Sequence, residues 1–298
     1  MANVIDGEGV AAEVRAGLEG PIATLEASDQ TPTLATVLMS DDPASQTYVE
    51  LKQQDCEELG ILTRDVSVDP SASPERLHTV IDELSADPDV DGILVQLPLP
   101  DHVDERAALR RIDPAKDVDG FHPSNLGRLL AGDPRFVPCT PAGIRRLLSA
   151  AEAEIQGADV VIVGRGLVVG RPLSVLLSAR GPDADATVTL CHSKTESLAE
   201  KTRAADILVV AAGIPEFIDG SMVSEGVTVI DVGVNRVETD DGDDTALVGD
   251  VAFEAVAPYA DAITPVPGGV GPMTRAMLLH NTVQAAAGRA EIDVEPPE

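Results

Sequence analysis

The stretch Ala158–Gly181, ADVVIVGRGLVVGRPLSVLLSARG, decides the predicted fold. Its first residues form a continuous apolar run, which is typical of a strand buried on both faces of a parallel sheet. Three glycines then follow with the spacing G-x-G-x-x-x-G, before an apolar helical pattern. A strand, a glycine turn and a helix in this order favour a dinucleotide site, because glycines let the backbone approach a pyrophosphate and the helix N-terminus supplies N–H donors. A tight turn without a ligand is the alternative.

On both sides of this stretch, apolar β-type runs alternate with helical segments, which predicts an α/β fold. Pro43, Pro74 and Pro141, each preceded by an N-capping residue type, are expected to begin helices, and a last helix is expected from about Pro272 to Gly288. The region 113–138 is rich in Pro, Gly and Asp and is expected to cross between domains. The predicted strands are 33–39, 61–68, 92–96, 160–163, 186–190, 207–211, 227–232 and 262–264.

The charge of the chain is extreme, since 51 acidic and 21 basic residues give a formal net charge of −30. This charge argues against nucleic acid and anionic membranes as partners, because both bind basic surfaces. The acids recur along the whole chain, which indicates a solvated acidic surface. Their repulsion largely disappears in molar salt, where the screening length is about 3 Å, so we expect a salt-loving source. An unusually acidic protein of a mesophile is the alternative.

Several patterns that would indicate other classes of protein are missing from the sequence. Its three cysteines are far apart and odd in number, which argues against a disulfide framework and fits a reducing cytoplasm. No run of 18 apolar residues exists and the N-terminus is acidic, so we expect neither a transmembrane helix nor a signal peptide. The histidines and cysteines lack metal-binding spacing, and we expect no metal site.

The loop after the second strand of the dinucleotide region bears on the choice of cofactor. An NAD site usually carries Asp or Glu here for the ribose. This chain instead has Cys191-His192-Ser193-Lys194. Ser193, Lys194 and Arg165 could meet a 2′-phosphate, which favours NADP over NAD. An ordinary polar loop is the alternative.

Tyr48 and Lys52 form the first candidate for catalysis. They lie four residues apart on a predicted helix and therefore share one face. Desolvation or a nearby cation could lower the pKa of the lysine from about 10.4 toward neutrality, which suits acid–base chemistry. The pair also lies near the C-terminal end of a predicted strand, where open α/β sheets bind ligands. A surface lysine beside a half-buried tyrosine is the alternative.

Three further segments carry candidate ligand-binding residues. Gln96 ends a predicted strand and could orient a lysine or a substrate amide, or make only a loop hydrogen bond. Asp119 could bind an amidine-like ring edge, or serve only in a turn with Gly120. The loop PVPGGVGPMT, residues 265–274, has three glycines that allow close backbone approach to a phosphate, a carbonyl or a flat ring.

Eight segments together resemble one family, the bifunctional methylenetetrahydrofolate dehydrogenases/methenyltetrahydrofolate cyclohydrolases. They are DPASQTYVELK, DGILVQLPLP, KDVDGFHPSNLG, VGRGLVVGRP, TLCHSKT, VIDVGVNR, VGDV and TPVPGGVGPMT. The resemblance covers nearly the whole chain. It implies an α/β catalytic, folate-binding domain (1–138 with 268–298), a Rossmann-type parallel-sheet NADP-binding domain (139–267), and a cleft between them. It also implies a homodimer that serves one-carbon metabolism and purine biosynthesis.

The resemblance further implies a role for each site residue. Lys52 would be the catalytic lysine, Tyr48 would pack on the folate, Gln96 would hold Lys52, and Asp119 would anchor the pterin ring. Many members have serine where this chain has Gly166, which removes a hydroxyl near the cofactor phosphates. The other substrate contacts would be Val95, Leu97, Pro267, Gly268 and Gly269, and the cofactor contacts Gly164, Arg165, Gly166, Ser193 and Val234.

The implied function is NADP-dependent oxidation of 5,10-methylenetetrahydrofolate to 5,10-methenyltetrahydrofolate, followed by hydrolysis to 10-formyltetrahydrofolate. Short-chain alcohol dehydrogenases also use a Tyr-x-x-x-Lys pair, but there the pair follows the dinucleotide loop, whereas here it precedes that loop by more than a hundred residues. A non-catalytic NADP-binding protein is the second alternative. The presence of Tyr48, Lys52, Gln96 and Asp119 together argues against it.

Overall fold

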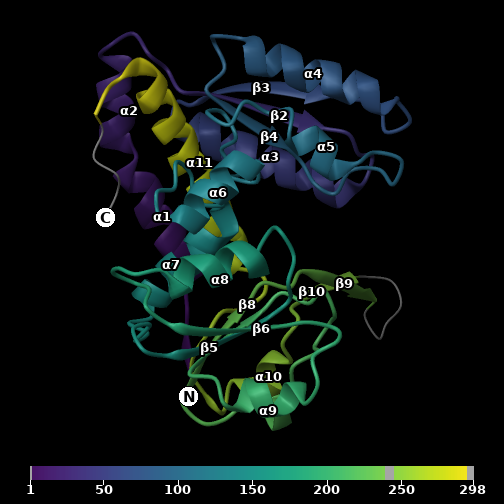
Figure 1. Ribbon diagram of the computed structural model, residues 1–298, viewed down its shortest axis with the longest axis vertical. Helices are drawn as coiled ribbons and strands as arrows, with labels where there is room; N and C mark the ends of the chain where they lie inside the picture. The colour runs from purple at the N-terminus through teal and green to yellow at the C-terminus, as the bar shows by residue number, and fades with distance from the viewer. Residues whose placement is uncertain (1, 239–244, 294–298) are drawn as a thin grey trace. The chain divides into compact units, whose positions relative to one another are not determined.

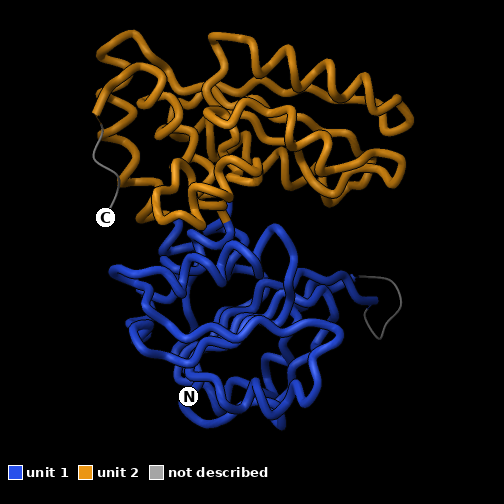
Figure 2. The backbone as a smooth tube through the Cα atoms, in the orientation of Figure 1, with its two compact units in different colours: residues 1–11, 140–274 blue, residues 12–139, 275–298 orange. Residues whose placement is uncertain are grey.

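The computed structural model describes residues 2–238 and 245–293 and divides the chain into two compact units (Figure 2). Unit 1 comprises Met1–Ala11 and Thr140–Thr274, and unit 2 comprises Ala12–Cys139 and Arg275–Glu298. The sequence prediction placed the residues before 12 in the other domain. In the structure, strand β1 (Asn3–Val4) instead pairs with strand β11 (Ala260–Ile263), which belongs to unit 1. The predicted outer limits, residues 1 and 298, lie outside the described residues.

Unit 1 is built on a six-stranded sheet with the order β1-β11-β8-β7-β5-β6, and every pair of neighbours is parallel. This arrangement confirms the predicted Rossmann-type sheet. From β5 the chain passes to β6 on one side and then to β7 on the other, so the strand order reverses between β5 and β7. Open α/β sheets bind ligands at the carboxyl ends of strands beside such a reversal. The remaining strands are β5 (Asp159–Val163), β6 (Thr187–Cys191), β7 (Ile207–Val210) and β8 (Val227–Asp231).

The helices of unit 1 connect these strands, and a hairpin extends from them. The sequence did not predict the antiparallel hairpin β9 (Asn235–Glu238) and β10 (Thr245–Val248), whose strands are short and only partly buried. The helices are α7 (Cys139–Ala150), α8 (Gly170–Ser178), α9 (Leu198–Arg203), the 3-10 turn η1 (Gly220–Met222) and α10 (Phe253–Val256).

Unit 2 contains a three-stranded parallel sheet with the order β3-β2-β4, formed by β2 (Thr33–Leu38), β3 (Leu62–Ser67) and β4 (Gly92–Val95). Figure 1 shows α3 (Pro43–Glu58) on one side of this sheet and α4 (Pro74–Ala86) on the other. Both helices begin at the predicted prolines. In α3 the Asp42 carboxylate caps the N-terminus by accepting a hydrogen bond from Ser45 N at 3.0 Å. The other helices are α1 (Gly7–Gly17), α2 (Glu19–Glu26), α5 (Glu105–Leu109), α6 (Pro123–Ala131) and α11 (Val270–Ala290).

The region 113–138 is not the crossing between domains that the sequence suggested, because it lies within unit 2 and contains α6. The buried Asp117 carboxylate organises its turn by accepting hydrogen bonds from Phe121 N (3.2 Å), His122 N (2.8 Å) and Asn125 Nδ2 (2.7 Å). The helix escaped prediction because His122 is its N-cap, with Nδ1 accepting from Ser124 N, in place of the usual Ser, Thr, Asp or Asn.

Helix α11 completes unit 2 from residue 275 onward. Its buried Asn281 donates from Nδ2 to Val118 O at 2.7 Å and to Val137 O at 3.0 Å. Near its end, Arg289 Nε lies 2.5 Å from Asp91 Oδ1. These contacts attach the helix to segments far earlier in the sequence. Within the described residues, no helix combines the length and the apolar character needed to cross a membrane.

Candidate active site

Lys52 and Gln96 meet inside unit 2. Lys52 is 8% exposed and belongs to the buried face of α3. Its Nζ donates a hydrogen bond to Gln96 Oε1 at 2.8 Å. Gln96 directly follows β4, and its Nε2 donates to Leu97 O at 2.8 Å, which turns the amide oxygen toward the lysine. The structure therefore brings together two residues that the sequence placed on a helix and at a strand end.

Asp119 and Cys139 act on the same ammonium group. Burial lowers the pKa of Lys52, whereas the Asp119 carboxylate and the Cys139 thiol favour its charged form. Burial likewise raises the pKa of Asp119, and Lys52 and a hydrogen bond with Cys139 oppose that rise. The pKa of Cys139 is raised well above its ordinary range by burial and by Asp119. The protonation of each group therefore depends on the others, as is common in sites for proton transfer.

An ion pair that the sequence analysis missed lies beside Lys52. Arg275 Nη1 is 3.0 Å from Asp55 Oδ2, and the two side chains are only 13% and 9% exposed. Asp55 is three residues after Lys52 on α3, so its place on the buried face was readable from helical spacing. Arg275 lies more than two hundred residues away in the chain, and no local pattern links it to Lys52. Cys139 was missed for the same reason.

The other predicted substrate residues of unit 2 border this cluster in the sequence. Tyr48 lies one turn before Lys52 on α3 and is half-buried. Val95 is 2% exposed at the end of β4 and packs in the hydrophobic core, so its backbone is the part that a ligand could reach. Leu97 is partly buried against the same core and precedes a cis peptide bond to Pro98.

The predicted folate loop belongs to unit 1, between β11 and α11. Gly268 has a φ of +100°, which side-chain-bearing residues rarely adopt, and the bond from Val266 to Pro267 is cis. A Cβ built on Gly7 would lie only 2.0 Å from Gly269 O. The loop therefore packs directly on the backbone at residue 7, at the start of α1. Gly268 is required by its backbone conformation, and Gly7 is required by this close approach.

The glycine turn after β5 lies at the strand reversal of unit 1. Gly164 has a φ of +128°, and a Cβ there would be 2.1 Å from Ala211 O, which follows β7. A Cβ on Gly170, at the start of α8, would be 1.8 Å from Gly164 O. Gly166 has open space where its Cβ would be. Two glycines are thus explained by packing of the turn, and the third leaves room for a ligand beside the helix N-terminus.

The loops around this turn supply donors that fit a dinucleotide with a 2′-phosphate. Ser193 and Lys194 follow β6 and are exposed, as is Arg165. The β6 loop is ordered by His192 N donating to Thr195 Oγ1 at 2.8 Å and Lys194 N donating to His192 Nδ1 at 3.1 Å. Val234, after β8, is 50% exposed. A hydroxyl, an ammonium, a guanidinium and a helix N-terminus are suitable partners for phosphate groups.

Two buried acids order the same edge of the sheet. The Asp250 carboxylate accepts hydrogen bonds from Ala212 N (2.6 Å), Gly213 N (2.8 Å) and Ile214 N (3.0 Å). The Asp231 carboxylate accepts from the backbone N–H groups of residues 233, 250 and 251, each at 2.9 Å. Burial raises the pKa of Asp231 to about 6 despite these hydrogen bonds. The loops after β7 and β8 therefore share one buried network.

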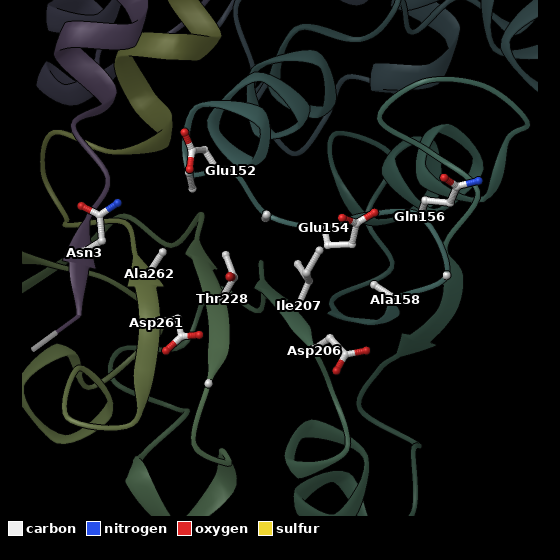
Figure 3. Close-up of a pocket in the computed structure, with 14 residues that line it drawn as sticks. Asn3, Glu152, Glu154, Gln156, Ala158, Asp206, Ile207, Thr228, Asp261 and Ala262 are labelled. Carbon is white, nitrogen blue, oxygen red and sulfur yellow. The ribbon is translucent and has the colours of Figure 1, made fainter.

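A separate cavity of about 510 Å³ lies at the amino ends of the strands of unit 1 (Figure 3). Its polar lining includes Asn3, Glu152, Glu154, Asp206 and Asp261, and no residue predicted for substrate or cofactor lines it in the described part of the chain. Among residues 2–238 and 245–293, no group of three His, Cys, Asp or Glu side chains is placed to hold a metal ion.

Comparisons with known proteins agree over the whole length of the chain. Residues 5–119 match the tetrahydrofolate dehydrogenase/cyclohydrolase catalytic domain, and residues 138–290 match the NAD(P)-binding domain of the same family. The bifunctional protein FolD of Haloquadratum walsbyi is 60% identical over 100% of this chain and 95% of its own, and that of Natronomonas pharaonis is 59% identical over 100% of both.

Solved structures give the same result. The bifunctional methylenetetrahydrofolate dehydrogenase/cyclohydrolase of Campylobacter jejuni shares 44% identity with a TM-score of 0.90, covering 97% of this chain and 100% of that chain. The dehydrogenase-cyclohydrolase of Trypanosoma brucei, solved with NADP and an inhibitor, shares 39% identity with a TM-score of 0.90, covering 97% and 98%.

Proposed function

Since this chain belongs to the tetrahydrofolate dehydrogenase/cyclohydrolase family, we propose that Lys52, Gln96 and Asp119 form the centre at which it acts on folate. The protein is a bifunctional enzyme that oxidises 5,10-methylenetetrahydrofolate with NADP and hydrolyses the methenyl product to 10-formyltetrahydrofolate. The observation that carries the assignment of the centre is the 2.8 Å hydrogen bond from a buried lysine to Gln96. The family match leaves neither an alcohol dehydrogenase nor a non-catalytic NADP-binding protein with support.

In the oxidation, NADP supplies the acceptor for the hydride that leaves the one-carbon bridge. The two nitrogens that flank the bridge stabilise the resulting methenyl cation, so the main task of the protein is to hold the substrate in position. Asp119 binds the edge of the pterin ring through its carboxylate, and Tyr48 packs on the ring. Unit 2 is the folate-binding, catalytic part of the chain.

In the hydrolysis, water adds to the methenyl carbon and gives up a proton to the Lys52 amine. The carbinolamine then collapses: the bond from the carbon to N5 breaks, the hydroxyl loses a proton, and N5 takes one up. Burial favours the neutral amine that this step needs, because it lowers the pKa of Lys52. Gln96 Oε1 fixes the position of Nζ, and Asp119 keeps the protonated form accessible for the return of the proton.

The cofactor is held by unit 1. The N-terminus of α8 and the open space at Gly166 support binding of the pyrophosphate, while Arg165, Ser193 and Lys194 support binding of the 2′-phosphate. Gly164 and Val234 contact the cofactor from the loops after β5 and β8.

The enzyme works in the cytoplasm of a salt-loving cell as a homodimer. The net charge of −30 and the haloarchaeal relatives support the salt requirement. The three free, buried cysteines support a reducing compartment. Sedimentation in molar KCl tests the dimer, and a melting temperature that rises with KCl tests the salt requirement.

The experiment that tests the centre is a spectroscopic assay of methenyl formation and hydrolysis in molar KCl, with NADP and with NAD. Lys52→Met is expected to lower hydrolysis by about 100-fold to 10,000-fold, the range for a lost acid–base group. The exposed Lys201 gives a matched control, since Lys201→Met removes the same charge elsewhere. Full hydrolysis by Lys52→Met would overturn the assignment.

A further inference from the structure

The Asp55–Arg275 ion pair has no assigned part in the reaction, yet it lies in the charged cluster around Lys52. Its atoms are 3.0 Å apart and both side chains are largely buried. Withdrawing two charges from water is costly, and a buried ion pair is seldom more stabilising than apolar residues of similar volume. A buried pair at this place therefore calls for a role other than stability.

The groups around Lys52 come from each element packed there. Gln96 follows β4, and Asp119 precedes α6. Cys139 is the first residue of α7, Asp55 and Cys56 lie on α3, and Arg275 comes from α11. Among the groups that act on the charge of Lys52, Asp119, Cys139 and Cys56 favour the ammonium form, whereas Arg275 and burial disfavour it. Arg275 is thus the cation that opposes the acidic groups at this lysine.

We propose that Arg275, held in place by Asp55, is a positioning residue that sets the protonation of Lys52 and thereby the pH range of folate hydrolysis. The inference rests on the proposed role of Lys52 as the proton acceptor. The Asp55 carboxylate holds the guanidinium at 3.0 Å and carries the opposite charge, so the two members of the pair are expected to act on Lys52 in opposite directions. Arg275 is not a catalytic residue, because it works through the lysine.

Opposite effects of the two single substitutions make the proposal testable. Arg275→Met leaves the Asp55 anion without its ion-pair partner and raises the pKa of Lys52, so the acidic limb of the hydrolysis profile moves to higher pH. Asp55→Asn leaves the guanidinium uncompensated and moves the limb to lower pH. We expect shifts of about 0.5 to 1 pH unit each, since buried charges are only partly screened by salt. The double variant is expected to return close to the wild-type profile.

Two further variants separate charge from packing. Arg275→Lys keeps a cation at this position, so the acidic limb of its hydrolysis profile is expected to lie at the same pH as in the wild-type protein. Arg289→Met removes an arginine from the same helix, one whose partner is Asp91, and is expected to leave the limb in place. A purely structural role would lower the rate in both single variants without moving the limb, or would move it in the same direction in both. Either result would overturn the proposal.

A second measurement needs no turnover. The rate at which an amine reagent modifies Lys52, followed by mass spectrometry of its peptide across pH, reports the protonation of the lysine directly. Opposite shifts in this rate for Arg275→Met and Asp55→Asn support the inference. If those shifts appear while the hydrolysis limb stays fixed, the ion pair still sets the protonation of Lys52, but the proposed role of Lys52 as proton acceptor fails, and control of the pH range fails with it. If the modification rate does not shift, the inference fails.

Discussion

The two units bury their carboxylates against different partners. In unit 1, Asp231 and Asp250 face backbone N–H groups, which fix the loops at the carboxyl edge of the sheet. In unit 2, Asp119 faces Lys52 and a thiol, and Asp55 faces a guanidinium. Backbone donors cannot change their protonation, whereas ionisable side chains can. The first arrangement holds a binding surface still, and the second supports proton transfer.

The largest expected effect is on the backbone-bound acids. Asp250→Ala removes a buried carboxylate that accepts hydrogen bonds from three partly buried N–H groups, and a hydrogen bond to a charged group is worth about 1.5–3 kcal/mol. We expect a loss of about 4 kcal/mol in the free energy of unfolding, measured by urea titration at fixed KCl. Asp219→Ala is the control, since that exposed carboxylate caps only the short turn η1. An equal, small effect of the two substitutions would contradict the structural role of Asp250.

The next largest effect is expected on catalysis and not on stability. Asp119→Asn is expected to lower kcat/KM for folate about 100-fold, which is about 2.7 kcal/mol in the transition-state free energy. The free energy of unfolding should hold or rise, because burial raises the pKa of Asp119 and its charged form is therefore costly. Steady-state kinetics and urea titration on one preparation test both expectations. If Asp119→Asn lost as much stability as Asp250→Ala, the proposed difference between the buried carboxylates of the two units would be contradicted.

Asp117 sharpens the comparison, because it lies in unit 2 but accepts hydrogen bonds from backbone N–H groups and an amide. Burial raises its pKa to about 7, from about 3.9 in the unfolded chain. The wild-type protein therefore takes up a proton on folding, and this contribution to stability is lost as pH rises from about 4 to about 7.

An asparagine does not titrate, so the stability penalty of Asp117→Asn should be larger at pH 5 than at pH 8. It should narrow by about 2 kcal/mol by pH 8. Urea titration of both proteins across this range measures the change. A penalty that stays constant across this range would show that the carboxylate is charged throughout.

The smallest effect concerns exposed side chains at the carboxyl edge of the sheet of unit 1, where Asp231 and Asp250 order the loops. Replacing Ser193 and Lys194 by alanine is expected to raise KM for NADP about tenfold, or about 1.4 kcal/mol, and to leave KM for NAD unchanged. Stability should not change, since both side chains are exposed. Lys201→Ala controls for the loss of a lysine. An equal loss of affinity for both cofactors would contradict a 2′-phosphate contact.

Local signals account for the parts of the fold that the sequence predicted well. Pro43 and Pro74 after their capping residues located the starts of α3 and α4, and continuous apolar runs located the buried strands of unit 1. Strand β1 escaped prediction because it has two residues and exists only through its pairing with β11. Helix α6 escaped because its capping group is a histidine ring.

The site shows the same limit of sequence reasoning. Lys52, Gln96 and Asp119 lie in segments whose resemblance to the family is strong, and Gln96 indeed lies within hydrogen-bonding distance of Lys52. Arg275 and Cys139 reach the cluster through contacts between distant segments, which spacing along one helix or strand does not reveal. The sequence analysis did not single out Asp231 and Asp250, which lie in the segments VIDVGVNR and VGDV. Their hydrogen-bond partners are backbone N–H groups, and no sequence pattern identifies such partners.

Helix α11 has a consequence for the order in which the protein is made. A ribosome releases residues 140–274 before it releases the residues of α11 that contact Asp55, Asp91 and Val118. The strands of unit 1 are therefore made before the residues of α11 that belong to unit 2. Until residue 275 has been made, Lys52 lacks Arg275, so a chain stopped before that residue can contain every strand of the Rossmann-type sheet without the arginine that we propose acts on Lys52.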